Sequence, residues 1–117
     1  MKEGKLIHLS IELAIELTHL YDRIEKKAYL KNQLARAGTS VGANIHEAKY
    51  AHSRADFIAK MQIALKECHE TEFWLTVLSQ AIPEYSLDAT QLREKAGSIR
   101  RMLIATLNTA KNNGETE

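Results

Sequence analysis

The segment RAGTSVGANIHEA, residues 36–48, constrains the fold of this chain more than any other part of the sequence. Apolar residues recur in it at steps of four, four and three, which is the spacing of one helix face. They are Ala37, Val41, Ile45 and Ala48. Gly38 and Gly42 lie among them, and each glycine costs a helix about 1 kcal/mol relative to alanine. The segment is therefore either a loop or a helix in which the bare positions have a use.

A phosphate-binding loop is the alternative that would give these glycines a chemical role. A Walker A loop has glycines five residues apart followed by Lys and Ser or Thr, and a dinucleotide-binding loop has G-x-G-x-x-G between a strand and a helix. The sequence GTSVG has neither spacing, no lysine follows it, and no strand pattern precedes it. We therefore predict that residues 36–48 are a continuous helix.

On that helix, Gly38 and Gly42 lie on one shoulder with Ala35, where a neighbouring helix can approach almost backbone to backbone. The other shoulder carries the polar residues Ser40, Asn44 and Glu47. These side chains can bond polar groups across a helix contact. Two interpretations stay open: both shoulders pack inside the chain, or one of them is an interface between subunits.

Apolar spacing predicts four helices in the chain. They cover about residues 5–26, 29–50, 54–80 and 88–112. Ser53 and Asp56 resemble a capping box before the third helix, Pro83 is expected to end it, and Gly114 is expected to cap the fourth. The short connections predict a single all-α domain over residues 1–117, an up-down-up-down left-handed four-helix bundle.

The first predicted helix has an apolar stripe wider than one bundle core needs. Its seam consists of Leu6, Leu9, Leu13, Leu17, Leu20 and Ile24. A second strip beside the seam consists of Ile7, Ile11, Ala14 and Ile15. The second strip predicts a further contact surface.

The composition fits a soluble globular domain: of the 117 residues 44% are apolar and 26% are charged, and the net charge is +1. Charge alone therefore argues neither for nor against nucleic acid. Cys68 is the only cysteine, which excludes an intrachain disulfide and favours a reducing, cytoplasmic compartment. The longest apolar run is residues 102–105 and the start of the chain lacks the apolar core of a signal peptide, so we expect no membrane contact.

Few residues could carry chemistry. Glu16 and His19 form the Glu-x-x-His pair of di-iron bundles, but the sequence has no second copy, so we expect no metal and no cofactor. Cys68 falls on the core stripe, about 100° from His69, and is expected to be a small buried hydrophobe. No nucleophile–base pair is present, so we expect a protein that is not an enzyme.

The third predicted helix carries two features with open interpretations. Glu67, Glu70 and Glu72 are expected to form a solvated or interfacial acidic patch. Trp74 is either a groove filler or an anchor for an oligomer.

Basic residues are expected to gather at one end of the bundle, where the first connection meets the start of the fourth helix. This candidate nucleic-acid-binding set is Arg23, Lys26, Lys27, Lys31, Arg93 and Lys95, with Arg100 one heptad after Arg93. Such cations bind phosphate by salt-dependent contacts, and a ring would repeat them in every subunit. Nearby acidic residues dilute the set, so a solvated helix end without a ligand remains the alternative.

Residues 36–57 and 60–78 together resemble the signature of a four-helix-bundle family, the 23S rRNA intervening-sequence proteins, often labelled ribosomal proteins. The family pattern is Gly-x-Ser-Ile/Val, Asn-Ile-x-Glu, Ser-x-x-Asp-Phe and Ile-Ala-x-x-Glu-x-x-Glu. The matching positions are Gly38, Ser40, Val41, Asn44, Ile45, Glu47, Ser53, Asp56, Phe57, Ile63, Ala64, Glu67 and Glu70. Ala48 stands where many members have glycine, so the second helix can run further before it ends.

The resemblance implies a bacterial protein that assembles into a homopentamer. It also implies kinship with accessory proteins of diversity-generating retroelements, which act with a reverse transcriptase and nucleic acid. Candidates for helix packing and oligomer contacts are Gly38, Ser40, Gly42, Asn44, Glu47, Asp56 and Phe57. We therefore expect a non-enzymatic oligomer that associates with RNA or DNA; the alternative is an oligomeric adaptor that binds another protein and no nucleic acid.

Overall fold

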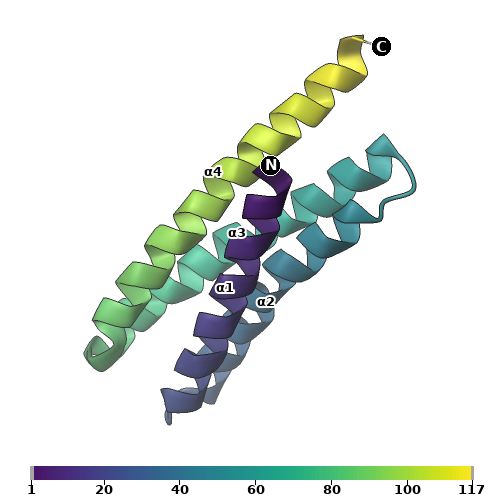
Figure 1. Cartoon of the computed structure of the whole chain (residues 1–117). Coiled ribbons are helices and arrows are strands. Elements are labelled where there is room, and N and C mark those ends of the chain that lie inside the picture. Colours follow the sequence, from purple (N-terminus) through teal and green to yellow (C-terminus); the bar gives the residue numbers. More distant parts are fainter. Residues whose placement is uncertain (1, 117) are drawn as a thin grey trace.

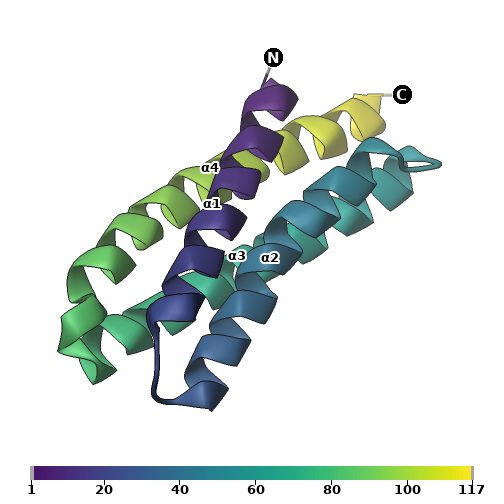
Figure 2. The same ribbon diagram turned by 60° about the horizontal axis from the view of Figure 1, so that its bottom comes forward.

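The computed structural model describes residues 2–116, with side chains from residue 4 to residue 113, and within that range it contains helices and no strands. The long helices are α1 (Lys2–Arg23), α2 (Ala28–Lys49), α3 (Arg54–Ala81) and α4 (Ser86–Thr116), with a short 3₁₀ helix, η1 (Pro83–Tyr85), before α4. The chain reverses direction at each connection, and both ends lie at the same end of the molecule (Figures 1 and 2). Consecutive helices pack together, as do α1 and α4. The arrangement fits a four-helix bundle, 51 Å long and 21 by 20 Å across.

The end of α1 differs from the prediction by three residues. Ile24 N–H still bonds the carbonyls of Leu20 and Tyr21, but the carbonyl of Ile24 accepts from Lys31 Nζ at 3.0 Å. Lys27 then adopts a left-handed conformation, with φ 58°, immediately before α2. The sequence has no glycine or proline here, so the predicted end at residue 26 was wrong for lack of a local stop signal.

Local signals placed the ends of α3 correctly. Ser53 Oγ accepts from the Asp56 N–H at 3.0 Å, which confirms the predicted cap, while the Asp56 carboxylate accepts from the His52 N–H at 3.2 Å. Pro83 follows Ile82, which leaves the helical region and ends the helix as predicted. Gly114 does not cap α4, however, because the helix continues to Thr116 and no glycine in the described range has a positive φ.

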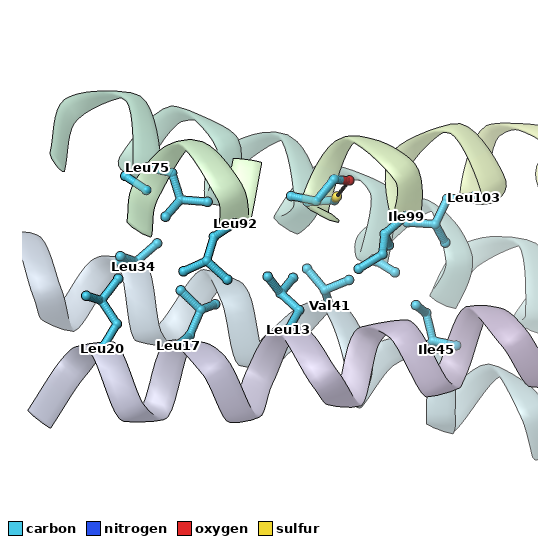
Figure 3. Close-up of a cluster of buried hydrophobic side chains, with 14 of the residues drawn as sticks. Leu13, Leu17, Leu20, Leu34, Val41, Ile45, Leu75, Leu92, Ile99 and Leu103 are labelled. Carbon is cyan, nitrogen blue, oxygen red and sulfur yellow. Dashed lines mark hydrogen bonds between the residues drawn. The ribbon is translucent and has the colours of Figure 1, made fainter. Parts of the chain in front are cut away.

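The core is a continuous layer of aliphatic side chains from all four long helices. Figure 3 shows leucines of α1 pointing toward α2 and toward Leu92 of α4. Tyr85 of η1 closes one end of this layer, and its hydroxyl donates to the carbonyl of Arg23 at 2.6 Å. The short connection after α3 is thus fixed to the end of α1.

Residues 36–48 are a continuous part of α2, as predicted, and the glycine shoulder faces α1. A Cβ at Gly38 would overlap Leu17 Cδ1, whereas one at Gly42 would lie 3.2 Å from Ser10 Oγ and 3.5 Å from the Ser10 carbonyl. The expected backbone-to-backbone approach was therefore wrong at Gly38, where a leucine methyl fills the space. At Gly42 the small Ser10 does allow the α1 backbone to come close. The glycine shoulder is used inside the chain.

The second apolar strip of α1 remains largely uncovered within the chain. Ile11 is 51% exposed and Ile15 is 49% exposed, although Ile7 packs partly against the core. No helix in residues 2–116 combines the length and the apolar character needed to cross a membrane.

Candidate nucleic-acid interface

The basic end of the bundle is defined by Arg23, Lys26, Lys27, Lys31 and Lys95. Arg23 Nη2 forms an ion pair with Asp88 Oδ2 at 3.0 Å, and its guanidinium lies 5.6 Å from the centre of the Tyr85 ring. This ion pair confirms that the end of α1 meets the start of α4. Because Asp88 offsets its charge, Arg23 adds little to a positive surface.

The remaining cations of the basic end differ in how free they are. Lys31 bonds the Ile24 carbonyl and lies 4.4 Å from the Tyr21 ring centre, and Lys95 pairs with Glu16 at 2.7 Å. Lys26 and Lys27 are exposed, and no carboxylate described in the structure forms an ion pair with either. The connection between α1 and α2 therefore carries the uncompensated charge of the basic end.

Two predicted cations, Arg93 and Arg100, lie on a different surface, between α3 and α4. Arg100 Nε donates to Glu72 Oε1 on α3 at 2.8 Å. Arg93 lines the same hollow, together with Arg101, which the sequence reasoning missed. Arg101 directly follows Arg100 and so points about 100° away on a helical wheel. Arg101 Nη1 nevertheless lies 3.4 Å from the position that a Cβ of residue 97 would take, and the glycine four residues earlier is the sequence signal that could have found it.

The expected acidic patch on α3 does not form, because its three carboxylates are paired with arginines. Arg36 of α2 reaches Glu67 at 2.9 Å and also bonds Glu70, while Glu72 pairs with Arg100. The Trp74 indole N–H donates to Glu70 at 3.0 Å. That hydrogen bond, and then Arg36, hold the pKa of Glu70 below its usual value. The bonds of Arg36 to Glu67 and Glu70, here called the α2–α3 seam, hold these two helices together.

The polar shoulder of α2 is used only in part as expected. Asn44 Nδ2 donates at 2.9 Å to the Ser40 carbonyl of its own helix, so the predicted bond across a helix contact is wrong for Asn44 within this chain. Glu47 does cross, to Lys60 of α3, at 3.1 Å. Ser40 and Asn44 are both half-buried.

An open groove of about 1160 Å³, here called the α1/α4 groove, runs along α4 beside the first half of α1. Its apolar lining includes Leu9, Phe57, Met102, Ala105 and Ala110. Its charged lining consists of Lys5, Arg54, Lys95, Arg101 and Glu94. Phe57, a predicted contact residue, thus combines packing against the core with a place in this groove.

The model of the family "23S rRNA-intervening sequence protein" matches residues 2–105, most of the chain. The chain belongs to this family. A crystal structure from Bacteroides thetaiotaomicron, of a protein with unknown function from the S23 ribosomal protein family, is 37% identical and has a TM-score of 0.88. The match covers 92% of this chain and 99% of that one. No curated protein matches the sequence.

In this 23S rRNA-intervening sequence family member, the groups considered for metal or redox chemistry have other partners. Glu16 pairs with Lys95, and no three His, Cys, Asp or Glu side chains within the described residues are placed to hold a metal ion. Cys68 is buried, and its thiol donates to the Ala96 carbonyl at 3.2 Å. Burial raises the pKa of Cys68 to about 12, so the side chain is a neutral thiol at physiological pH.

Proposed function

We propose that this protein is a non-enzymatic, cytoplasmic, up-down-up-down left-handed four-helix bundle that assembles into a homo-oligomer, a pentamer, and binds RNA or DNA through backbone phosphates. The observation that carries the proposal is that Lys26 and Lys27 are both exposed. No carboxylate among the described side chains forms an ion pair with either of them. A cation without a local partner is free to replace a counterion on phosphate.

Sequence-specific reading of bases is not part of this proposal. Single-strand binders stack bases on aromatic rings, and only Tyr21 and Tyr29 lie near the basic end. The Tyr21 ring is already covered by Lys31, and its hydroxyl bonds Asn32 at 2.7 Å. Tyr29 is 64% exposed, so it offers one aromatic ring on which a base could stack. Binding is therefore assigned to charge.

Assembly strengthens this proposal because each further subunit adds the same cations. One chain has a net charge of only +1, which favours weak binding by a monomer. Exposed apolar side chains on α1 and α3, among them Ile11, Ile15 and Phe73, give a second copy something to cover. The expected oligomer would present several copies of the Lys26–Lys27 pair to one nucleic acid.

The test is a salt titration of binding to a fluorescently labelled ribosomal RNA fragment and to duplex DNA, followed by anisotropy from 50 to 300 mM NaCl. We expect affinity to fall steeply with salt. Lys26→Gln with Lys27→Gln should reduce the slope of log affinity against log salt by about 0.7–0.9 per lost phosphate contact. Lys66→Gln with Lys111→Gln, two exposed cations elsewhere, is the matched control.

The two parts of the proposal fail separately. Absence of binding at 50 mM NaCl would refute nucleic-acid association. Equal effects of the two double variants would refute the assignment to Lys26 and Lys27 while leaving binding itself intact.

A second candidate function, an oligomeric adaptor for another protein, is favoured by one observation. The α1/α4 groove has an apolar floor formed by Leu9, Phe57 and Met102 with basic side chains at its edge. Such a surface suits a protein segment better than a phosphate chain. If no nucleic acid binds, a protein partner such as the reverse transcriptase implied by the resemblance becomes the leading proposal.

A further inference from the structure

Gly97 of α4 has no side chain, and two arginine side chains converge on the position that a Cβ would take there. Arg101 Nη1 and Arg100 Nη2 lie 3.4 Å and 3.6 Å from the position that a Cβ of residue 97 would take. The two nitrogens are thus no further apart than the sum of these distances. Arg93, one turn earlier, lines the same hollow of about 550 Å³, here called the Gly97 hollow.

The positive charge in the Gly97 hollow is only partly compensated. Arg100 uses Nε to bond Glu72, which leaves its Nη2 directed at Gly97. Arg101 uses Nη2 to bond the neutral Ser98 hydroxyl at 3.2 Å, which leaves Nη1 over the glycine. Glu94 also lines the hollow, but among the described side chains it forms no ion pair with Arg93 or Arg101. Of the three guanidiniums, only that of Arg100 has a carboxylate partner in the described structure.

We propose that the Gly97 hollow binds a phosphate oxyanion between Arg100 Nη2 and Arg101 Nη1, with Arg93 as a third donor. Guanidinium groups match phosphate oxygens in geometry and retain their charge at any physiological pH. An anion placed between the two converging cations turns their repulsion into attraction on both sides. The missing side chain at residue 97 lets an anion approach the helix closely.

The same oxyanion chemistry has two sources, inorganic phosphate and the phosphodiester backbone of a nucleic acid. The second source rests on the proposed function and adds to it a site on the α3–α4 face, away from Lys26 and Lys27. The first does not depend on the proposed function. An experiment with both ligands therefore separates the two ideas.

The direct test uses the full-length protein and inorganic phosphate. Sodium phosphate is titrated at constant ionic strength, balanced with NaCl, while the Nε–Hε signals of the arginines are followed by NMR. We expect saturable shifts of Arg100 and Arg101. The absence of saturable shifts, or equal shifts of Arg36 on the α2–α3 seam, would overturn the proposal.

Two variants test the assignment. Arg101→Gln should weaken phosphate binding about tenfold, and Gly97→Ala should weaken it at least threefold because its methyl occupies the hollow. Alanine favours a helix, so loss of binding in Gly97→Ala would not reflect unfolding. Lys111→Gln removes an equal charge 10 residues after Arg101 on α4 and should bind phosphate as the wild type does. Unchanged affinity in both hollow variants would refute the site.

The nucleic-acid arm repeats the salt titration with labelled RNA. Arg101→Gln should reduce the salt slope by about 0.7, whereas Lys111→Gln should leave it unchanged. Phosphate binding without RNA binding would support the Gly97 hollow and refute the proposed function. RNA binding that responds equally to Arg101→Gln and Lys111→Gln, with no saturable phosphate shift, would refute the Gly97 hollow and support the proposed function.

Discussion

At the scale of single residues, three glycines inside helices each have different neighbouring side chains. Gly38 accommodates the Leu17 side chain, Gly42 accommodates Ser10, and Gly97 lies under Arg100 and Arg101. Each costs its helix about 1 kcal/mol relative to alanine. The cost is offset by packing against α1 only for Gly38 and Gly42, since the neighbours of Gly97 are long side chains at the surface.

Alanine substitution should therefore change stability in opposite directions at Gly38 and Gly97. Gly38→Ala places a methyl on Leu17 Cδ1 in the core, and overpacking should lower the free energy of unfolding by about 1–2 kcal/mol despite the better helix propensity. Gly97→Ala meets only Arg101 at 3.4 Å and Arg100 at 3.6 Å and should raise it by up to about 1 kcal/mol. Urea unfolding followed by circular dichroism measures both.

Leu17→Ala supplies the control for this comparison. In the Leu17→Ala background, Gly38→Ala should be less destabilising than in the wild type, because the methyl that it displaces is gone. A Gly38→Ala protein as stable as Gly97→Ala would contradict the packing of Leu17 against Gly38.

At the scale of helix pairs, α2 and α3 are joined by a charged seam in which Arg36 bonds both Glu67 and Glu70. Glu67 is nearly buried, so loss of Arg36 would leave a carboxylate with little access to water. The Trp74 N–H adds a neutral donor to Glu70. The seam thus fixes α3 against α2 through the bonds of Arg36 to both carboxylates.

Acid should weaken this seam, and Trp74→Phe should reduce the effect. The pKa of Glu70 in the folded protein is lowered, first by the Trp74 hydrogen bond and then by Arg36. A lowered folded pKa adds stability above the unfolded value of about 4.3, and that stability is lost as the pH falls through the folded pKa. Trp74→Phe brings the folded pKa nearer to the unfolded one. The variant should therefore lose less unfolding free energy between pH 7 and pH 3, as measured by urea unfolding.

Glu70→Gln tests whether this pH dependence belongs to Glu70. In that background Trp74→Phe should no longer alter the difference in unfolding free energy between pH 7 and pH 3. An unchanged effect would assign the pH dependence to another carboxylate.

The boundaries of these elements were predictable wherever the signal is local. Ser53 caps α3 and Pro83 ends it because both effects act within a few residues. The end of α1 was not predictable, since Lys31 caps the Ile24 carbonyl from the next helix. Gly114 misled because glycine permits a left-handed cap without requiring one.

The candidate site was less predictable than the helices, because ion pairs between helices depend on their relative register. The sequence predicted that Arg23, Arg93 and Arg100 belong to one basic set. It placed Arg23 near the start of α4 correctly, but Arg93 and Arg100 lie between α3 and α4. It could not show that Asp88 pairs with Arg23 or that Glu72 pairs with Arg100. Periodicity likewise placed Gly38 on a shoulder but could not identify Leu17 as the side chain that fills it.

At the scale of the whole molecule, the four helices bury a continuous apolar core but leave apolar side chains exposed on the outer faces of more than one helix. Ile11 and Ile15 lie one turn apart on α1, and Phe73 on α3 is 57% exposed. Isolated apolar residues are ordinary at a surface, but neighbours on one helix face are typical of a contact with another molecule. The wide stripe of α1 was the sequence signal for this face.

Self-association through α1 predicts that Ile11→Lys with Ile15→Lys dissociates the oligomer without unfolding the chain. Both side chains are about half exposed, so the free energy of unfolding of the monomer should change little, whereas buried lysines in an interface would oppose assembly. Light scattering should give a multiple of the 13.2 kDa chain mass, fivefold for a pentamer, in the wild type and the single-chain mass in the variant.

Leu87→Lys, at a side chain that is 72% exposed on α4, is the control and should keep the oligomer. Because lysine adds positive charge in both variants, a loss of assembly confined to α1 would come from the apolar contact; a wild-type monomer, or equal dissociation by Leu87→Lys, would refute this interface.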